Sequence, residues 1–132
     1  LPARGPMRRT GARPDRQLLG AEGERRAAEA LVAAGYKVIG RNVRAGQGEL
    51  DIVCRDGDAW VFVEVKTRRG TDYGSGAEAL TPTKQARLLR AARAWMVQEG
   101  IEDGDWRFDV VSVTFRRLGP PEIEVIRNAF GD

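Results

Sequence analysis

Two segments with alternating apolar side chains flank Asp56-Gly57, and this arrangement constrains the fold of the chain most strongly. Residues 49–54 and 59–67 are rich in Val, Ile, Phe and Trp, which favour β-strands. An Asp-Gly pair between two such segments is a strong signal for a tight hairpin. The sequence therefore predicts two adjacent antiparallel strands at the centre of a sheet.

The remaining segments predict an α/β fold with the element order α-β-β-β-α-β-β and one mixed sheet flanked by helices. Helices are expected over residues 16–34, with Gly35 at the end, and over residues 82–99, where Thr81 offers an N-cap. The other strands are expected over residues 36–42, 106–115 and 122–126, with a glycine-containing loop over residues 68–80.

Charge and composition predict a basic tail in front of one domain. Residues 1–15 are rich in Pro, Gly and Arg, so we expect a disordered tail there and a single domain over residues 16–132. Residues 1–20 contain five Arg against Asp15, or +4, in a chain whose formal net charge is +3. The tail is interpreted either as a solvated leader or as an auxiliary arm for nucleic acid.

The chain contains no His and one Cys, Cys54, which excludes several chemistries. A Ser-His-Asp triad, a Cys-His pair, a His-ligated zinc and an internal disulfide are all ruled out. Acid–base or metal chemistry must then use carboxylates, Lys, Arg, Tyr, Ser or Thr. A lone Cys fits the reducing cytoplasm, and no apolar segment approaches the roughly 20 residues of a membrane span. We therefore expect a cytoplasmic protein with no membrane partner.

Charged side chains occupy one face of the predicted hairpin. If Asp56-Gly57 forms a two-residue turn, opposing residue numbers sum to 113, and Glu49 opposes Glu64. Glu49, Asp51, Glu64 and Lys66 then share one face, with Asp51 and Glu64 as diagonal neighbours; Leu50, Ile52 and Cys54 point the other way.

Such a face is suited to a divalent cation. Hard oxygen ligands without His or Cys suit Mg²⁺, and Lys66 beside them could stabilise an anionic transition state or position a water. The alternative is a solvated face in which Lys66 pairs with Glu64 or Asp51. Two large aromatics on the same face, Trp60 and Phe62, argue against that alternative.

Glu24 is a second charged residue in an apolar setting. Ala27, Ala28 and Leu31 follow it at helical spacing, which places it on the face expected to pack on the sheet. Carboxylates are seldom buried unless they are paired or bind a metal. Glu24 therefore either belongs to the functional site or forms a salt bridge with Arg41 or Arg44.

The segments 48–53 (GELDIV) and 61–68 (VFVEVKTR) resemble the two halves of a PD-(D/E)XK nuclease motif, with Leu50 in place of its Pro. Further matching strings are Gly23-Glu24, Gly35-Tyr36, Arg41-Asn42-Val43-Arg44, Arg107-Phe108-Asp109 and Asn128-Ala129-Phe130. Over roughly residues 17–130 the chain closely resembles the YraN-like family of bacterial proteins, which are predicted endonucleases and similar to archaeal Holliday-junction resolvases. The resemblance implies a restriction-endonuclease-like core and a Mg-dependent (or Mn-dependent) endonuclease acting on DNA, including branched or junction DNA.

The resemblance also implies a role for each matching residue. Asp51 and Glu64 would bind the metal with the backbone carbonyl of Val65, and Glu24 and Glu49 are further candidate ligands. Lys66 would orient or activate the attacking water and stabilise the developing charge. Glu24 would assist through a second metal or a bound water.

A site that cleaves phosphodiesters needs cations around it. Basic residues recur every three positions in the second helix, and two more directly follow Lys66. The candidate nucleic-acid contacts are Arg41, Arg44, Arg68, Arg69, Lys84, Arg87 and Arg90, with Tyr73 as a weaker candidate for base stacking. The alternatives are a solvated helix face and, for Arg44, neutralisation of Glu24 or Glu49.

Other interpretations stay open at this point. The chain could be a nucleic-acid-binding module of the same fold that does not cut, or an adaptor for an acidic protein. A branched junction is roughly two-fold symmetric, so a resolvase would act as a homodimer. Arg107 and Asp109 share a strand face and are expected to pair, while Cys54, Trp106 and Phe108 are expected in the core.

Overall fold

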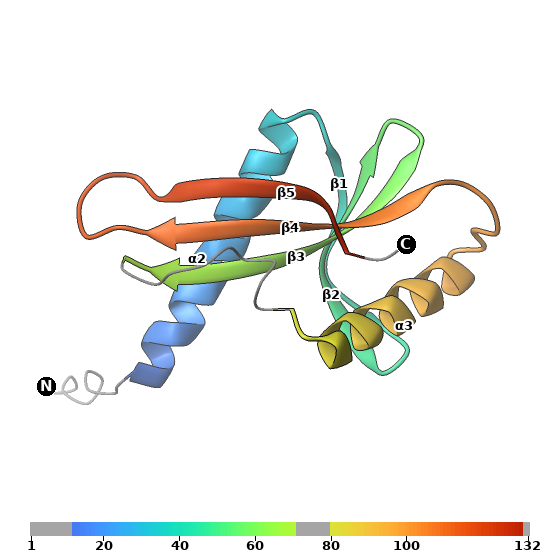
Figure 1. Cartoon of the computed structure of the whole chain (residues 1–132), viewed down its shortest axis with the longest axis horizontal. Helices are drawn as coiled ribbons and strands as arrows, with labels where there is room; N and C mark the ends of the chain where they lie inside the picture. The colour runs from blue at the N-terminus through green and yellow to red at the C-terminus, as the bar shows by residue number, and fades with distance from the viewer. Residues whose placement is uncertain (1–11, 71–79, 131–132) are drawn as a thin grey trace, which may run out of the picture.

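The computed structural model describes residues 12–70 and 80–130, with side chains from residue 18 onward. Its elements are α2 (Ala12–Ala33), β1 (Lys37–Ala45), β2 (Gly48–Asp56), β3 (Ala59–Arg69), α3 (Pro82–Gln98), β4 (Trp106–Phe115) and β5 (Glu122–Phe130). The predicted α/β class and element order are confirmed. The two helices pack on different faces of one twisted sheet, with α2 crossing behind it in Figure 1.

The sheet has the strand order β1-β2-β3-β4-β5. Neighbouring strands are antiparallel except β3 and β4, which pair in parallel and are connected through α3. A parallel pair needs such a crossover, because a tight turn can join only antiparallel strands. The result is the mixed sheet that the sequence predicts.

Two hydrophobic cores lie on the two faces of the sheet. The α3 side is rich in aromatic residues, and Phe62 contacts Trp95, Trp106 and Phe108 with ring centroids 5.7–6.1 Å apart. The α2 side is aliphatic and includes Leu31, Ile52, Cys54, Val61, Val63, Val111 and Val113. Both faces of the central strands are therefore buried, which explains their nearly continuous apolar sequence.

The helix starts follow local sequence signals. Thr81 caps α3, since its Oγ1 accepts a hydrogen bond from the Lys84 amide at 3.2 Å, and Pro82 occupies the first helical position as predicted. Helix α2 begins at Ala12, four residues before the predicted start. Pro14 is compatible with this longer helix because the first turn does not need its missing N–H. Residues 1–11 of the predicted tail lie outside the described residues.

Strand β5 extends to Phe130, four residues beyond the predicted end. Phe130 pairs with Phe108 across the β4–β5 ladder, and their rings stack with centroids 4.4 Å apart. This contact holds the polar segment before Phe130 in the sheet. The local sequence there does not indicate it, because the partner residue is 22 positions away.

The hairpin between β2 and β3 has a different register from the predicted one. Asp56 pairs with Ala59, so Gly57-Asp58 forms the loop and opposing residue numbers sum to 115. Gly57 has φ +60°, and Gly at the first position is the requirement of a type II′ turn. The observed register differs from the predicted one by two residues. Because side chains alternate between the faces with a period of two, this shift by itself moves no side chain to the other face of the sheet.

One predicted face assignment in β2 is wrong. Leu50 packs in the α3-side core, whereas Ile52 and Cys54 pack in the α2-side core. The strict alternation of side chains is therefore broken at Asp51. Opposite this position in β1 stands Asn42, which has a left-handed φ of +51°. The irregularity allows Leu50 to be buried next to a carboxylate that borders a hollow.

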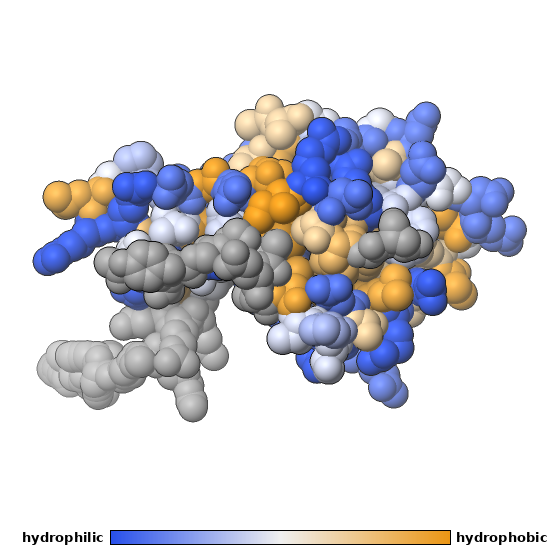
Figure 2. Space-filling view, in the orientation of Figure 1, coloured by the Kyte–Doolittle hydropathy of each residue, from blue (hydrophilic) through white to orange (hydrophobic). Residues whose placement is uncertain are grey.

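Neither described helix is long and apolar enough to cross a membrane. On the face shown in Figure 2, hydrophilic side chains are interspersed with smaller hydrophobic areas.

Candidate metal and nucleic-acid site

Asp51 of β2 and Glu64 of β3 lie together at a hollow of about 370 Å³. The Val65 amide donates a hydrogen bond to Asp51 Oδ2 at 2.8 Å, which fixes this carboxylate against the neighbouring strand. Glu64 is buried, with 8% of its surface exposed. The residues lining the hollow are Arg44, Gln47, Gly48, Glu49, Asp51, Glu64, Lys84, Arg87 and Leu88.

The two carboxylates influence each other. Burial, together with the nearby Glu64 carboxylate, raises the pKa of Asp51 well above its usual range, although the Val65 amide opposes this shift. Two like charges in a poorly hydrated position are unfavourable unless a cation compensates them. The site therefore offers a favourable position for positive charge.

Two lysines supply such charge. Lys84 Nζ lies 2.9 Å from Glu64 Oε2 and forms a salt bridge with it. Lys66 lies beside Lys84, and burial together with that second ammonium lowers the pKa of Lys66. Burial acts to lower the pKa of Lys84, but the hydrogen bond and charge of Glu64, together with the effects of Lys66 and Asp51, raise it overall. The structure thus places Lys84, expected as a surface contact on α3, within the carboxylate site.

Neither Glu24 nor Glu49 joins Asp51 and Glu64 to form a cluster of three carboxylates. Glu24 faces Arg41, with 4.0 Å between the Arg41 guanidinium and Glu24 Oε1, so the alternative salt bridge is the observed arrangement. It still lies near enough to contribute to the raised pKa of Asp51. Glu49 is exposed at the rim of the hollow and stands opposite Arg44 in the β1–β2 ladder. Among the described residues, no group of three or more acidic or Cys side chains could hold a metal.

The arginines predicted to contact nucleic acid fall into three groups. Arg44 of β1 and Arg87 of α3 are exposed and line the hollow. Arg41 and Arg90 are exposed outside its lining. Arg68 and Arg69 belong to the end of β3 rather than to the predicted loop, because they continue the ladder with Thr114 and Phe115 of β4. Tyr73 lies outside the described residues.

Arg107 and Asp109 form a separate polar network in β4. Asp109 is fully buried and accepts hydrogen bonds from the Tyr36 hydroxyl (2.7 Å), Arg107 Nε (3.0 Å) and the Asn128 amide (2.9 Å). Arg107 also donates to Asp56 Oδ2 at 2.8 Å. The predicted pairing of Arg107 with Asp109 is therefore confirmed. Sequence reasoning missed the other partners of this pair, which include Tyr36, Asp56 and the Asn128 amide.

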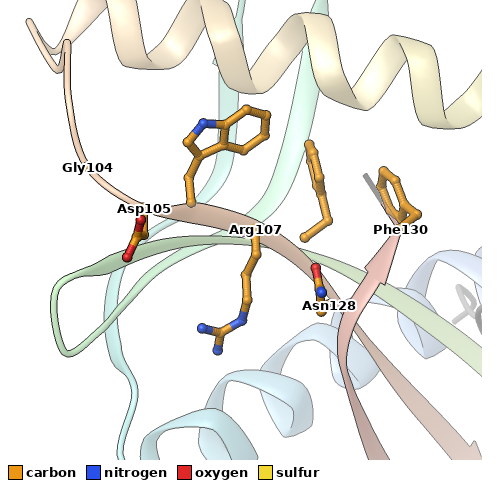
Figure 3. A pocket seen from close by; sticks show the side chains of 7 residues that line it. Gly104, Asp105, Arg107, Asn128 and Phe130 are labelled. Atoms are coloured by element: carbon orange, nitrogen blue, oxygen red, sulfur yellow. The ribbon is translucent and has the colours of Figure 1, made fainter. Parts of the chain in front are cut away.

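A second hollow, of about 200 Å³, lies next to this network and is lined by Gly104, Asp105, Trp106, Arg107, Phe108, Asn128 and Phe130. Figure 3 shows Arg107 extending away from the aromatic side chains of this hollow. Its guanidinium is taken up by Asp56 and Asp109, so it presents no uncompensated charge to a ligand. We interpret this end of the sheet as structural.

Cys54 is fully buried in the α2-side core, as predicted. Burial raises the pKa of its thiol to about 12. Because the thiolate is the reactive form, Cys54 is a small hydrophobic residue and not a nucleophile.

The donor set at the first hollow fits Mg²⁺ or Mn²⁺. Mg²⁺ is commonly held by one or two carboxylates, with water and substrate phosphate completing its coordination. Asp51 and Glu64 provide two carboxylates, and no softer ligand competes for the ion in the lining of the hollow. The contribution expected from the Val65 carbonyl stays a prediction.

Comparisons with known proteins place the chain in a family. The profile described as "Uncharacterised protein family UPF0102" matches residues 23–113. The chain is 47% identical over 114 residues to a UPF0102 protein of Geobacter sulfurreducens, covering 86% of this chain and 89% of that protein. It is 48% identical over 112 residues to one of Symbiobacterium thermophilum, covering 85% of this chain and 95% of that protein. These matches confirm the resemblance to the YraN-like family.

Proposed function

The chain belongs to the uncharacterised protein family UPF0102, and we propose that it is a metal-dependent endonuclease that hydrolyses phosphodiester bonds in DNA. The observation that carries this proposal is the pairing of Asp51 with Glu64 in a half-buried hollow beside two lysines. The resemblance of the surrounding segments to the PD-(D/E)XK motif supports it. The names of the relatives state a family and no activity, so the proposal rests on the site.

Asp51 and Glu64 are the proposed ligands of Mg²⁺ or Mn²⁺. When bound, the cation would supply Lewis-acid chemistry and neutralise charge on the phosphoryl group. The Val65 amide keeps Asp51 directed toward Glu64, so the two carboxylates do not have to be ordered when the ion arrives.

Lys66 is the proposed residue for handling the attacking water. Its lowered pKa increases the fraction of neutral amine, which can accept a hydrogen bond from water. In its protonated form the same side chain stabilises the negative charge that develops on the phosphorus oxygens. Both roles need the amine near the carboxylate pair, and they are supported by the charges of Glu64 and Asp51, which lie close enough to Lys66 to influence its pKa.

Arg44 and Arg87 are the proposed contacts to the phosphate backbone. They line the same hollow as the carboxylates and come from two different elements, so a nucleic-acid strand bound there would meet both cations. Such contacts position the backbone and do not read bases. This supports recognition of nucleic-acid shape, with branched or junction DNA as the candidate substrate and a symmetric homodimer as the matching assembly.

The test is cleavage of labelled four-way junctions, flaps and linear duplexes with Mg²⁺ or Mn²⁺. We expect cleavage by the wild type and a loss of about 100-fold or more in Asp51→Ala, which removes a proposed metal ligand, and in Lys66→Ala, which removes the amine that stabilises the developing charge. Glu122→Ala is the matched control, since Glu122 is an exposed carboxylate paired with Arg116 on the surface. Cleavage that survives both site substitutions would overturn the assignment.

A second candidate function is a nucleic-acid-binding module of the same fold that does not cut. The salt bridge of Lys84 with Glu64 favours it, because a lysine already neutralises one proposed ligand. Calorimetric titration with Mn²⁺ discriminates the two functions. Binding of DNA without any binding of Mn²⁺ would support the module.

A further inference from the structure

Lys84 forms a close salt bridge with Glu64, which is one of the two proposed metal ligands. Its ammonium lies 2.9 Å from Glu64 Oε2, and only 10% of the Glu64 side chain and 35% of the Lys84 side chain are exposed. An ion pair in such a poorly hydrated place is stronger than one on an open surface. Lys84 therefore occupies one of the two Glu64 oxygens that a cation could use.

The position of Lys84 in its helix gives an independent argument. Its amide donates to the N-cap residue Thr81, which places Lys84 in the first turn of α3. The start of a helix carries partial positive charge and disfavours a cation. Helix stability thus does not account for a lysine here, whereas the bond to Glu64 does.

The charges of the site lead to the same conclusion. The carboxylates of Asp51 and Glu64 are balanced by the ammonium groups of Lys66 and Lys84 when all four are charged. A divalent cation entering with both ammonium groups in place would leave an excess of two positive charges. The excess is relieved if one lysine leaves, and Lys84 is bonded directly to a ligand oxygen.

We infer that Lys84 is a displaceable counter-ion of Glu64, which holds this carboxylate when no metal is bound and competes with the divalent cation for it. The inference rests on the proposed function, in which Glu64 is a metal ligand. Lys84 is in this sense a positioning residue: it keeps a buried carboxylate compensated and ordered until the cation replaces it. Its presence should lower the affinity for the cation.

Calorimetric titration of the whole chain with Mn²⁺ alone tests the competition. Lys84→Met removes the charge at similar length and should bind Mn²⁺ about fivefold more tightly or better, the lower end of the usual range for coupled sites. Lys84→Arg keeps the charge and should retain the wild-type affinity. Arg117→Met, which removes an exposed cation from the turn between β4 and β5, controls for net charge and should also leave the affinity unchanged.

Thermal unfolding gives a second measurement that does not depend on activity. In EDTA, Lys84→Met should unfold at a lower temperature than the wild type, because Glu64 loses its partner. Excess Mn²⁺ should then raise the unfolding temperature of Lys84→Met more than that of the wild type.

The outcomes separate the two proposals. Mn²⁺ binding of equal or weaker affinity in Lys84→Met overturns the inference and leaves the proposed function in place. If the wild type and every variant fail to bind Mn²⁺, the proposed function and the inference are both overturned. Tighter binding by Lys84→Met alone supports the inference.

Discussion

At the scale of single residues, Asp109 and Asp51 are an aspartate buried in the sheet and a partly buried one, and they are in opposite situations. Asp109 accepts bonds from Tyr36, Arg107 and the Asn128 amide, so its charge is fully compensated. Asp51 accepts one backbone hydrogen bond and faces a second carboxylate. Removing a partner from a paired buried charge such as Asp109 is strongly destabilising. A buried carboxylate next to another carboxylate, such as Asp51, is instead held in an unfavourable state that a bound cation would relieve.

This contrast predicts different effects on stability. Asp109→Ala should lower the free energy of unfolding by about 3 kcal/mol, because it leaves the partly buried Arg107 without its main partner. Asp51→Ala should change it by less than about 1 kcal/mol, since the lost hydrogen bond is offset by relief from repulsion. Urea unfolding of both variants without divalent metal measures the difference. Equal destabilisation by the two substitutions would contradict the proposed division of roles.

At the scale of elements, the sequence predicts the bounds of the helices and strands better than the register in which the strands pair. Strand β4 has the predicted bounds, and α3 begins at the predicted cap. The hairpin register differs because two-residue loops of types I′ and II′ both accept a Gly57, and an Asp lies on each side of it. The choice between the two registers depends on how side chains pack on both faces of the sheet, and the local sequence of the hairpin says little about this packing.

The candidate site shows the same limit. Alternation in the strands predicts that Asp51, Glu64 and Lys66 come together, and this requires only neighbouring strands. Lys84 is 18 residues from Lys66 in the sequence and on another element, so its entry into the site depends on how α3 crosses the sheet. The signal that could have indicated it is the lysine in the first turn of a helix, where a cation is disfavoured.

The contact between α2 and β3 depends on a close approach at Gly23. A Cβ atom there would lie 2.1 Å from Thr67 Oγ1 and 3.1 Å from Thr67 Cβ, so the helix or the strand would have to shift. Gly23→Ala should therefore destabilise the protein by about 1–3 kcal/mol, as overpacking usually does. The expected loss is seen as a lower midpoint of urea unfolding.

The matched control for this prediction is in the same helix. A Cβ atom at Gly20 would meet no heavy atom within 4 Å. Gly20→Ala should raise the free energy of unfolding by up to about 1 kcal/mol, because Ala is the better helix former. If both substitutions stabilise the protein, the close packing at Gly23 is not a constraint.

At the scale of the whole molecule, the net charge of +3 describes the surface poorly. Several arginines form salt bridges within the chain. Arg107 pairs with Asp56 and Asp109, and Arg25 pairs with Glu22. Arg44 and Arg87 lie at the hollow that contains the carboxylates. Which cations serve a binding surface therefore depends on tertiary structure, and the regular spacing of basic residues along α3 predicts only part of it.

This distribution predicts how DNA binding responds to salt. Each phosphate contact contributes about −0.9 to the slope of log K against log salt concentration on duplex DNA. Arg44→Ala and Arg87→Ala should each weaken binding and make the slope shallower by about that amount, because each removes one contact at the hollow. Arg117→Ala removes the same formal charge from the exposed turn between β4 and β5 and should leave the slope unchanged.

Fluorescence anisotropy with a labelled duplex in EDTA, at several salt concentrations, measures DNA binding by the wild type and the three variants without cleavage. A slope that changes equally in the three variants would mean that DNA responds to net charge alone, and the hollow would then not be the binding surface.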